Sequence, residues 1–209
     1  MTEDRTRRFW NKSADKYARR PVSDQAAYER KLEISRNYLN PDSEVLEIGC
    51  GTGSTAIAHA PYVGHIRATD LSTRMIEIAA DKAGQAGVSN VDFEVSSIED
   101  LEVSAESVDV VMAHSVLHLV ADRDAVLQFI QGWLKPGGVM IASTACIGDM
   151  MWPIRMILPL GRTLGFFPLV RSFTREQLET SIRDNGLALE ESWRPSSNAA
   201  VFHVARKTV

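Results

Sequence analysis

Apolar and polar positions follow two different periods along the chain. Over residues 1–40, apolar side chains recur at helical spacing, which predicts a helical segment. From residue 44 on, short apolar runs alternate with amphipathic stretches, and runs this apolar are typical of parallel strands buried on both faces. The predicted strands are EVLEIG (44–49), HIRATD (65–70), VDFEV (91–95), SVDVVMAH (107–114) and VMIASTA (139–145), with helices over about 54–59, 72–86 and 122–134.

The alternation breaks after Cys146. Residues 146–171 are apolar but contain several prolines and glycines, so they suit neither one long helix nor an ordinary surface loop. A capped helix (172–186) and two strands (187–193 and 198–206) follow, and a turn near Pro195 makes the strands a hairpin. The pattern predicts an α/β fold in one domain over 1–209: a doubly wound, seven-stranded Rossmann-like sheet, mostly parallel, with an antiparallel C-terminal hairpin and an N-terminal helical cap.

Composition narrows the class of protein. The chain has 209 residues, of which 44% are hydrophobic, enough for one domain with a core. Its net charge is -4 and its pI about 5.8, so we expect no nucleic-acid partner. Cys50 and Cys146 form neither a CxxC pair nor a metal-ligand spacing, which favours a cytoplasmic protein without a disulfide or metal site. We expect no signal peptide and no transmembrane segment.

The segment VLEIGCGTGSTA (45–56) carries the clearest candidate chemistry. Gly49, Gly51 and Gly53 directly follow a predicted strand and permit positive φ, so a ligand can approach the backbone closely. In open α/β sheets, ligands bind outside the carboxyl ends of the strands, where the strand order reverses. Asp70 ends the next predicted strand, where a carboxylate can accept hydrogen bonds from both hydroxyls of a ribose.

Two residues beside the glycines distinguish between two classes of ligand. A dinucleotide-binding turn follows the pattern G-x-G-x-x-G, but Ser54 stands at the last position here. Glu47, two residues before the first glycine, would repel a pyrophosphate and suits a ligand that carries an ammonium group. The turn therefore favours an amino-acid nucleoside over a nicotinamide dinucleotide.

The segment VLEIGCGTG resembles motif I of the class I S-adenosylmethionine-dependent methyltransferases. Three further segments are similar to family motifs in the same order: ATDLSTRMIEIAADKA, FEVSSIEDLEVSAESVDVVMAHSVLHLV and WLKPGGVMIAS. The resemblance covers 45–143 and is nearest to the small-molecule group that includes quinone and sterol methyltransferases. It implies an enzyme that uses S-adenosyl-L-methionine and leaves S-adenosyl-L-homocysteine as product.

The resemblance also implies a role for individual residues. Glu47 would orient the methionine end of the cofactor, and Asp70 would hold its ribose. Ser97 stands where many members have an aspartate for the adenine amino group, so Glu99 is a candidate to compensate. For Tyr17 and Tyr28, which resemble aromatic residues that close over the cofactor, simple packing in helix faces is the alternative. The residues implied to bind the cofactor are Tyr17, Tyr28, Glu47, Gly49, Cys50, Gly51, Gly53, Asp70, Leu71, Met75, Ser97, Ile98, His114 and Ser115.

His114 and His118 are the candidate catalytic residues. Methyl transfer from a sulfonium is an in-line displacement, so the enzyme mainly positions the acceptor and excludes water. A base is needed only if the acceptor must lose a proton. The two histidines follow a predicted strand at a spacing of four, although either could instead bond to backbone and shape the loop. No third ligand has a spacing that would make the pair a metal site.

The apolar segment 146–171 is the candidate acceptor side, because it follows the fifth predicted strand. Met150, Met151, Trp152, Met156, Phe166 and Phe167 could form an adaptable apolar wall. Arg155, Arg162 and Arg171 could meet an acidic group on the acceptor or phospholipid head groups. We expect a small, apolar or lipophilic acceptor, with peripheral membrane contact through 147–170 as one option and a self-packed lid as another.

Three functions can be distinguished. The first is methyl transfer to an O, N, S or C atom of a small molecule by a monomer or homodimer. The second, a nicotinamide-dependent oxidoreductase, is disfavoured by Glu47, by Ser54 and by the lack of a Tyr-x-x-x-Lys pair. The third is a cofactor-binding module without catalysis, which the intact glycines and Asp70 disfavour.

Overall fold

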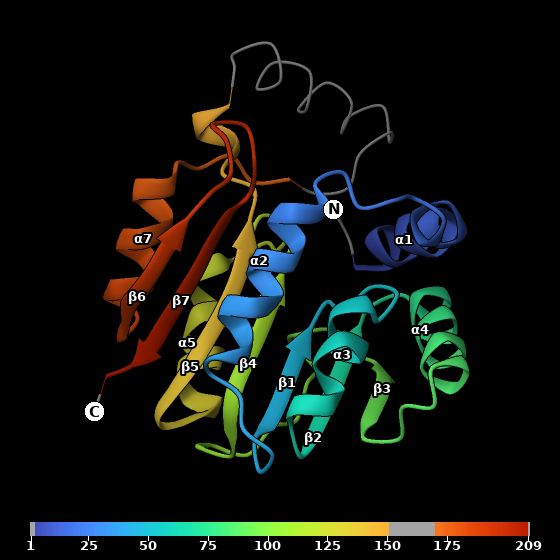
Figure 1. The fold of residues 1–209 in the computed structure, drawn as a ribbon. Helices are drawn as coiled ribbons and strands as arrows, with labels where there is room; N and C mark the ends of the chain where they lie inside the picture. The colour runs from blue at the N-terminus through green and yellow to red at the C-terminus, as the bar shows by residue number, and fades with distance from the viewer. Residues whose placement is uncertain (1–2, 151–169, 209) are drawn as a thin grey trace.

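A seven-stranded sheet forms the centre of the computed structural model, which describes residues 3–150 and 170–208 (Figure 1). The strand order is β3-β2-β1-β4-β5-β7-β6. All pairs are parallel except those of β7, which runs antiparallel to both β5 and β6. The strands are β1 (Glu44–Ile48), β2 (His65–Asp70), β3 (Val91–Val95), β4 (Val108–His114), β5 (Leu134–Thr144), β6 (Leu187–Trp193) and β7 (Val201–Lys207). The predicted fold class, including the antiparallel hairpin, is confirmed.

Helices cover both faces of this sheet. The α-helices are α1 (Glu3–Ala18), α2 (Gln25–Arg36), α3 (Ser54–His59), α4 (Thr73–Gln85), α5 (Arg123–Trp133) and α7 (Arg175–Asp184), with 3-10 turns η1 (Ala60–Tyr62) and η2 (Ile147–Asp149). One apolar core joins the sheet to α5 and α7, and the other joins its opposite face to α2, α3 and α4. Each core forms because β1, β4 and β5 are apolar on both faces.

The predicted helical segment 1–40 consists of two helices with different positions. Helix α2 packs on the sheet, where Ile34 joins the second core. Helix α1 lies against α4, away from the strands (Figure 1). The two helices of the predicted cap thus pack against different parts of the fold.

The start of β5 differs from the prediction. The sequence predicts this strand over 139–145, but β5 already begins at Leu134. Leu134 pairs with Val108, and the register then shifts before Val139 pairs with Val110. Gly137, with φ of 77°, absorbs the extra residues within this irregular strand pair. Among the described residues, no helix has the length and apolar character needed to cross a membrane.

Candidate functional site

A cavity of about 400 Å³ opens at the carboxyl ends of β1, β2 and β4. It lies where the strand order reverses between β1 and β4, the usual position of a ligand in such a sheet. The predicted site residues on its wall are Tyr17, Gly49, Gly51, Asp70, Leu71, Met75, Ser97, Ile98, His114, Ser115 and His118. Tyr28, Glu47, Cys50 and Gly53 were also predicted but do not line it.

The turn after β1 brings bare backbone to the cavity. Gly49 and Gly51 have φ of 64° and 55°, values that residues with side chains rarely adopt. A Cβ atom on Gly49 would lie 2.2 Å from Cγ2 of Val116, so no side chain fits there. The backbone amide of Cys50 donates to the Thr69 carbonyl at 2.8 Å and ties the turn to β2. A ligand can therefore lie directly against the main chain.

Asp70 ends β2 beside this turn. Its two carboxylate oxygens accept hydrogen bonds from the backbone amides of Gly51 (2.9 Å) and Ser72 (2.8 Å). Burial raises the pKa of Asp70, and these two bonds oppose the rise because they favour the carboxylate. Each carboxylate oxygen has about two acceptor sites, so both can still accept a bond from a ligand.

Ser97 is engaged by a residue that was not predicted. Its hydroxyl donates to the Asp100 carboxylate at 2.8 Å and accepts from the Asp100 backbone amide at 3.1 Å. Ser97 itself lies on the wall, as does Glu99. The carboxyl group of Glu99 is thus available on this side of the cavity, where the family resemblance implied an aspartate at position 97.

Glu47 lies behind the glycine turn. Its residue exposure is 1%, and its Oε2 has no hydrogen-bond partner among the described residues. Burial raises the pKa of Glu47 to about 8, with a further rise from the charge of Asp70 and opposition from a hydrogen bond to the Ala56 backbone. Oε2 is an unfilled acceptor at the carboxyl end of β1.

Three other predicted residues, Gly53, Cys50 and Tyr28, also lie off the wall. Gly53 is the N-cap of α3, and a Cβ atom there would lie 2.8 Å from both Ala79 and Phe93, so it lets elements pack closely. Cys50 is buried, and burial raises the pKa of its thiol, which makes it unreactive. Tyr28 on α2 is half-buried, and burial raises its pKa.

Helix α1 supplies part of the cavity wall. The motifs at the ends of the strands did not predict this part. Asn11 Oδ1 accepts hydrogen bonds from the Ser72 hydroxyl (2.7 Å) and the Arg74 backbone amide (3.2 Å). Arg74 also pairs with Asp15 at 2.8 Å, so α1 is joined to the start of α4, close to Asp70. The α1 residues on the wall are Glu3, Thr6, Trp10 and Tyr17.

The two candidate catalytic histidines lie together on the wall. His114 ends β4, and Ser115 after it has φ of 60°, an uncommon value outside glycine. His114 Nε2 and His118 Nδ1 are buried with no partner among the described residues. Burial lowers the pKa of His114 to about 3 and that of His118 to about 4. Both imidazoles are therefore neutral near pH 7 and offer one unpaired ring nitrogen each.

Lys31 and Ser143 adjoin this pair and were not predicted. Lys31 Nζ on α2 donates to the Ser143 hydroxyl at 2.9 Å. Ser143 pairs with His114 across β4 and β5, and the charge of Lys31 helps to lower the pKa of His114. Because Lys31 and Ser143 are 112 positions apart, no local pattern could predict their contact. The one signal for it in the sequence was a lysine within a predicted helix.

The predicted acceptor segment lies largely outside the described residues. This holds for Met151, Trp152, Arg155, Met156, Arg162, Phe166 and Phe167, and for most of the proposed membrane contact. Arg171 is described: its backbone amide donates to the His118 carbonyl (2.8 Å) and its guanidinium to the Ala121 carbonyl (2.7 Å). Within 3–150 and 170–208, no group of three or more His, Cys, Asp or Glu residues is arranged to hold a metal.

Comparisons with known proteins identify the family of this chain. A family model described as a methyltransferase domain matches residues 39–195. A ubiquinone biosynthesis O-methyltransferase from Cereibacter sphaeroides is 32% identical over 123 residues, which are 59% of this chain and 49% of that protein. The chain spans about half the length of the first curated relatives that it matches.

Two further proteins extend the comparison. A carboxy-S-adenosyl-L-methionine synthase from Shewanella woodyi is 29% identical over 173 residues, covering 76% of this chain and 69% of that protein. The solved structure of a geranyl diphosphate C-methyltransferase from Streptomyces coelicolor superposes with a TM-score of 0.75 at 15% identity, covering 99% of this chain and 98% of that one. At this identity the superposition shows a shared fold.

Proposed function

The chain belongs to the class I S-adenosylmethionine-dependent methyltransferases, and on that premise we propose that it transfers a methyl group from S-adenosyl-L-methionine to a small, apolar acceptor. The observation that carries the proposal is that Gly49, Gly51 and Asp70 lie together on the wall of one cavity. Bare backbone and a carboxylate with open acceptor sites meet there, at the point where the strand order reverses.

The residues present fit this cofactor. Asp70 would hold the ribose through its remaining lone pairs, and the Gly49–Gly51 backbone would lie along the methionine chain. Glu47 has a buried oxygen without a partner, which could accept a hydrogen bond from an ammonium group. Of the other predicted residues on the wall, Leu71, Met75 and Ile98 would enclose the adenine by apolar contact.

The acceptor would lie toward His114 and His118. When bound, S-adenosylmethionine supplies an electrophilic methyl group on a sulfonium. The protein's own part is to exclude water and to orient the acceptor against the wall. His118 is neutral near pH 7 and can take a proton from an acceptor that has one to lose. His114 would orient that acceptor through its unpaired ring nitrogen.

An assay with methyl-labelled S-adenosylmethionine tests the proposal. The full chain is incubated with separate acceptors that offer a phenol, an amine, a thiol or an activated carbon, each in a free and a carboxylated form. Label should pass to at least one acceptor, and Asp70→Asn should abolish the transfer. Binding of S-adenosylhomocysteine without transfer to any of them would favour the module without catalysis.

A further inference from the structure

Lys31 is a half-buried cation without an opposite charge beside it. Its Nζ makes one hydrogen bond to a described residue, the bond to the Ser143 hydroxyl at 2.9 Å. No carboxylate within 3–150 or 170–208 forms an ion pair with it, and Asp24 acts only through charge at a distance. An ammonium group has three donors, and holding it partly out of water without a counter-charge costs free energy.

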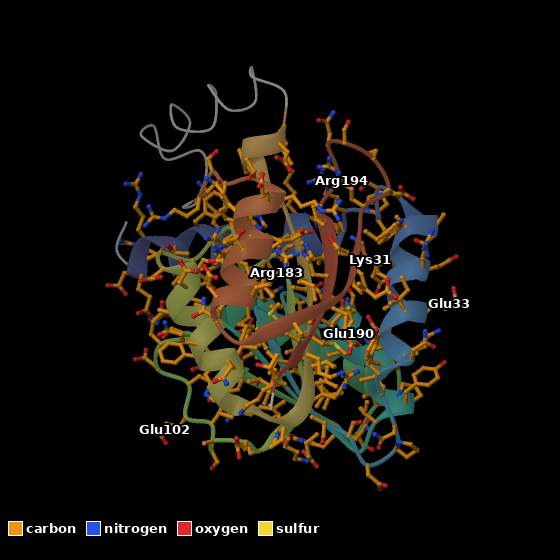
Figure 2. All side chains as sticks on the ribbon, turned by 90° about the vertical axis from the view of Figure 1, so that its left-hand side faces the viewer. Lys31, Glu33, Glu102, Arg183, Glu190 and Arg194 are labelled. Atoms are coloured by element: carbon orange, nitrogen blue, oxygen red, sulfur yellow. The ribbon has the colours of Figure 1, made fainter. Side chains whose placement is uncertain are left out.

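The position of Lys31 links this charge to the candidate catalytic residues. Figure 2 shows Lys31 on the inner side of α2, whereas Glu33 on the same helix points outward. Ser143 is 5% exposed and ends β5 opposite His114, whose ring lies on the cavity wall. Three polar groups from α2, β4 and β5 therefore meet at the carboxyl edge of the sheet.

The distribution of charge around the cavity is uneven. Apart from Tyr17 and the two histidines, the titratable side chains among the described residues of its wall are all acidic, namely Glu3, Asp70 and Glu99. These suit a cationic donor such as a sulfonium. Lys31 does not line this wall; its Nζ lies 2.9 Å from the hydroxyl of Ser143, which pairs with His114 across β4 and β5. A cation therefore adjoins the His114 side of the cavity, whereas carboxylates line the donor side.

We propose that Lys31 and Ser143 recognise a carboxylate on the methyl acceptor, so that the substrates are small carboxylic acids. The inference rests on the proposed function, because it names the acceptor of that same site. One ammonium and one hydroxyl balance one negative charge. A diphosphate would need further cations, and a neutral acceptor would leave Lys31 unpaired.

Binding of carboxylates to the protein with S-adenosylhomocysteine tests this. Benzoate is compared with benzamide, and hexanoate with hexanamide, by calorimetric titration. Each pair has one shape and differs in charge, and the two pairs separate an aromatic from an aliphatic body. The wild-type chain should bind at least one acid about tenfold to a hundredfold more tightly than its amide, the range for a hydrogen bond to a charged group. This step does not depend on any variant.

Two variants and a control then assign the preference. Lys31→Met should remove it, and Lys31→Arg should keep part of it. Lys135→Met is the matched control, because Lys135 pairs with Asp109 at the opposite end of β5, and it should retain the full preference.

The possible failures can be told apart. If S-adenosylhomocysteine does not bind, the proposed function fails and this inference with it. If it binds but the wild-type chain shows no preference for either acid, the inference alone is overturned. It is also overturned if Lys31→Met binds S-adenosylhomocysteine normally and still prefers the acid.

Discussion

The two ends of the cavity are built from different parts of the protein. The donor end consists of backbone held at positive φ and of Asp70, which is itself fixed by two backbone amides. The acceptor end consists of side chains: His114 and His118, supplied by β4 and the loop after it. Lys31 of α2 adjoins them through Ser143. Backbone geometry tolerates almost no substitution, whereas a side chain can be exchanged without moving the chain. The acceptor can therefore change while the donor stays the same.

The largest effect should follow from adding one carbon at the donor end. Gly49→Ala places a Cβ atom 2.2 Å from Val116 in a backbone conformation that costs alanine free energy. We expect a loss of about 3 kcal/mol in the free energy of unfolding, and a loss of S-adenosylhomocysteine binding. Chemical denaturation and calorimetry measure the two quantities.

Gly84→Ala is the matched control. Gly84 lies in α4, and nothing lies within 4 Å of an added Cβ atom there. This variant should gain about 0.5–1 kcal/mol, because alanine favours a helix over glycine. Equal behaviour of the two variants would contradict the view that backbone geometry defines the donor end.

Substitution of His118 should affect turnover and leave the donor end intact. For an acceptor that must lose a proton, His118→Asn should lower kcat by about 100-fold or more, as expected for a missing base. The affinity for S-adenosylhomocysteine, measured by calorimetry, should stay within about twofold. If His118→Asn keeps the wild-type kcat with such an acceptor, His118 shapes the loop and does not act as a base.

The two ends should respond oppositely to pH. The pKa values of His114 and His118 are lowered to about 3 and 4, so their contribution to stability is complete above the unfolded value of about 6.5 and is lost on acidification. Each histidine should contribute about 1.4 kcal/mol per pH unit between its two pKa values. The pKa of Glu47 is raised to about 8, so its contribution is complete below about pH 4.5 and is lost as the pH rises to 8.

Unfolding free energies from pH 4 to 9 test these signs. His114→Asn with His118→Asn should flatten the acid side, and Glu47→Gln should flatten the alkaline side. An acid side that keeps its slope in the double histidine variant would show that other groups govern it.

The smallest effect concerns α1. Asn11→Ala removes two hydrogen bonds to the start of α4, so the affinity for S-adenosylhomocysteine should fall by about threefold to tenfold. Asp15→Ala removes only an exposed ion pair with Arg74 and should change the affinity little. If Asp15→Ala loses more affinity for S-adenosylhomocysteine than Asn11→Ala, then Asp15, and not Asn11, holds α1 against α4.

The contrast between the two ends also explains what the sequence could predict. The glycine turn and Asp70 belong to contiguous motifs, so local pattern was enough to predict the strands, the fold class and the residues proposed for the donor end. Lys31 and Ser143 come together only when α2 packs on β5, and no local pattern encodes that contact. The roles of Tyr28 and Glu47 remain predictions, because neither lies on the described wall.

Parallel titration of the full chain with S-adenosylhomocysteine and with NAD tests the central claim most directly. The wild-type chain should bind one S-adenosylhomocysteine and no NAD. Asp70→Asn should weaken that binding by about 100-fold, because an amide cannot accept from both backbone amides and a ribose, while Asp92→Asn on the exposed part of β3 should not. Binding of NAD in preference to S-adenosylhomocysteine, or unchanged binding in Asp70→Asn, would contradict the account.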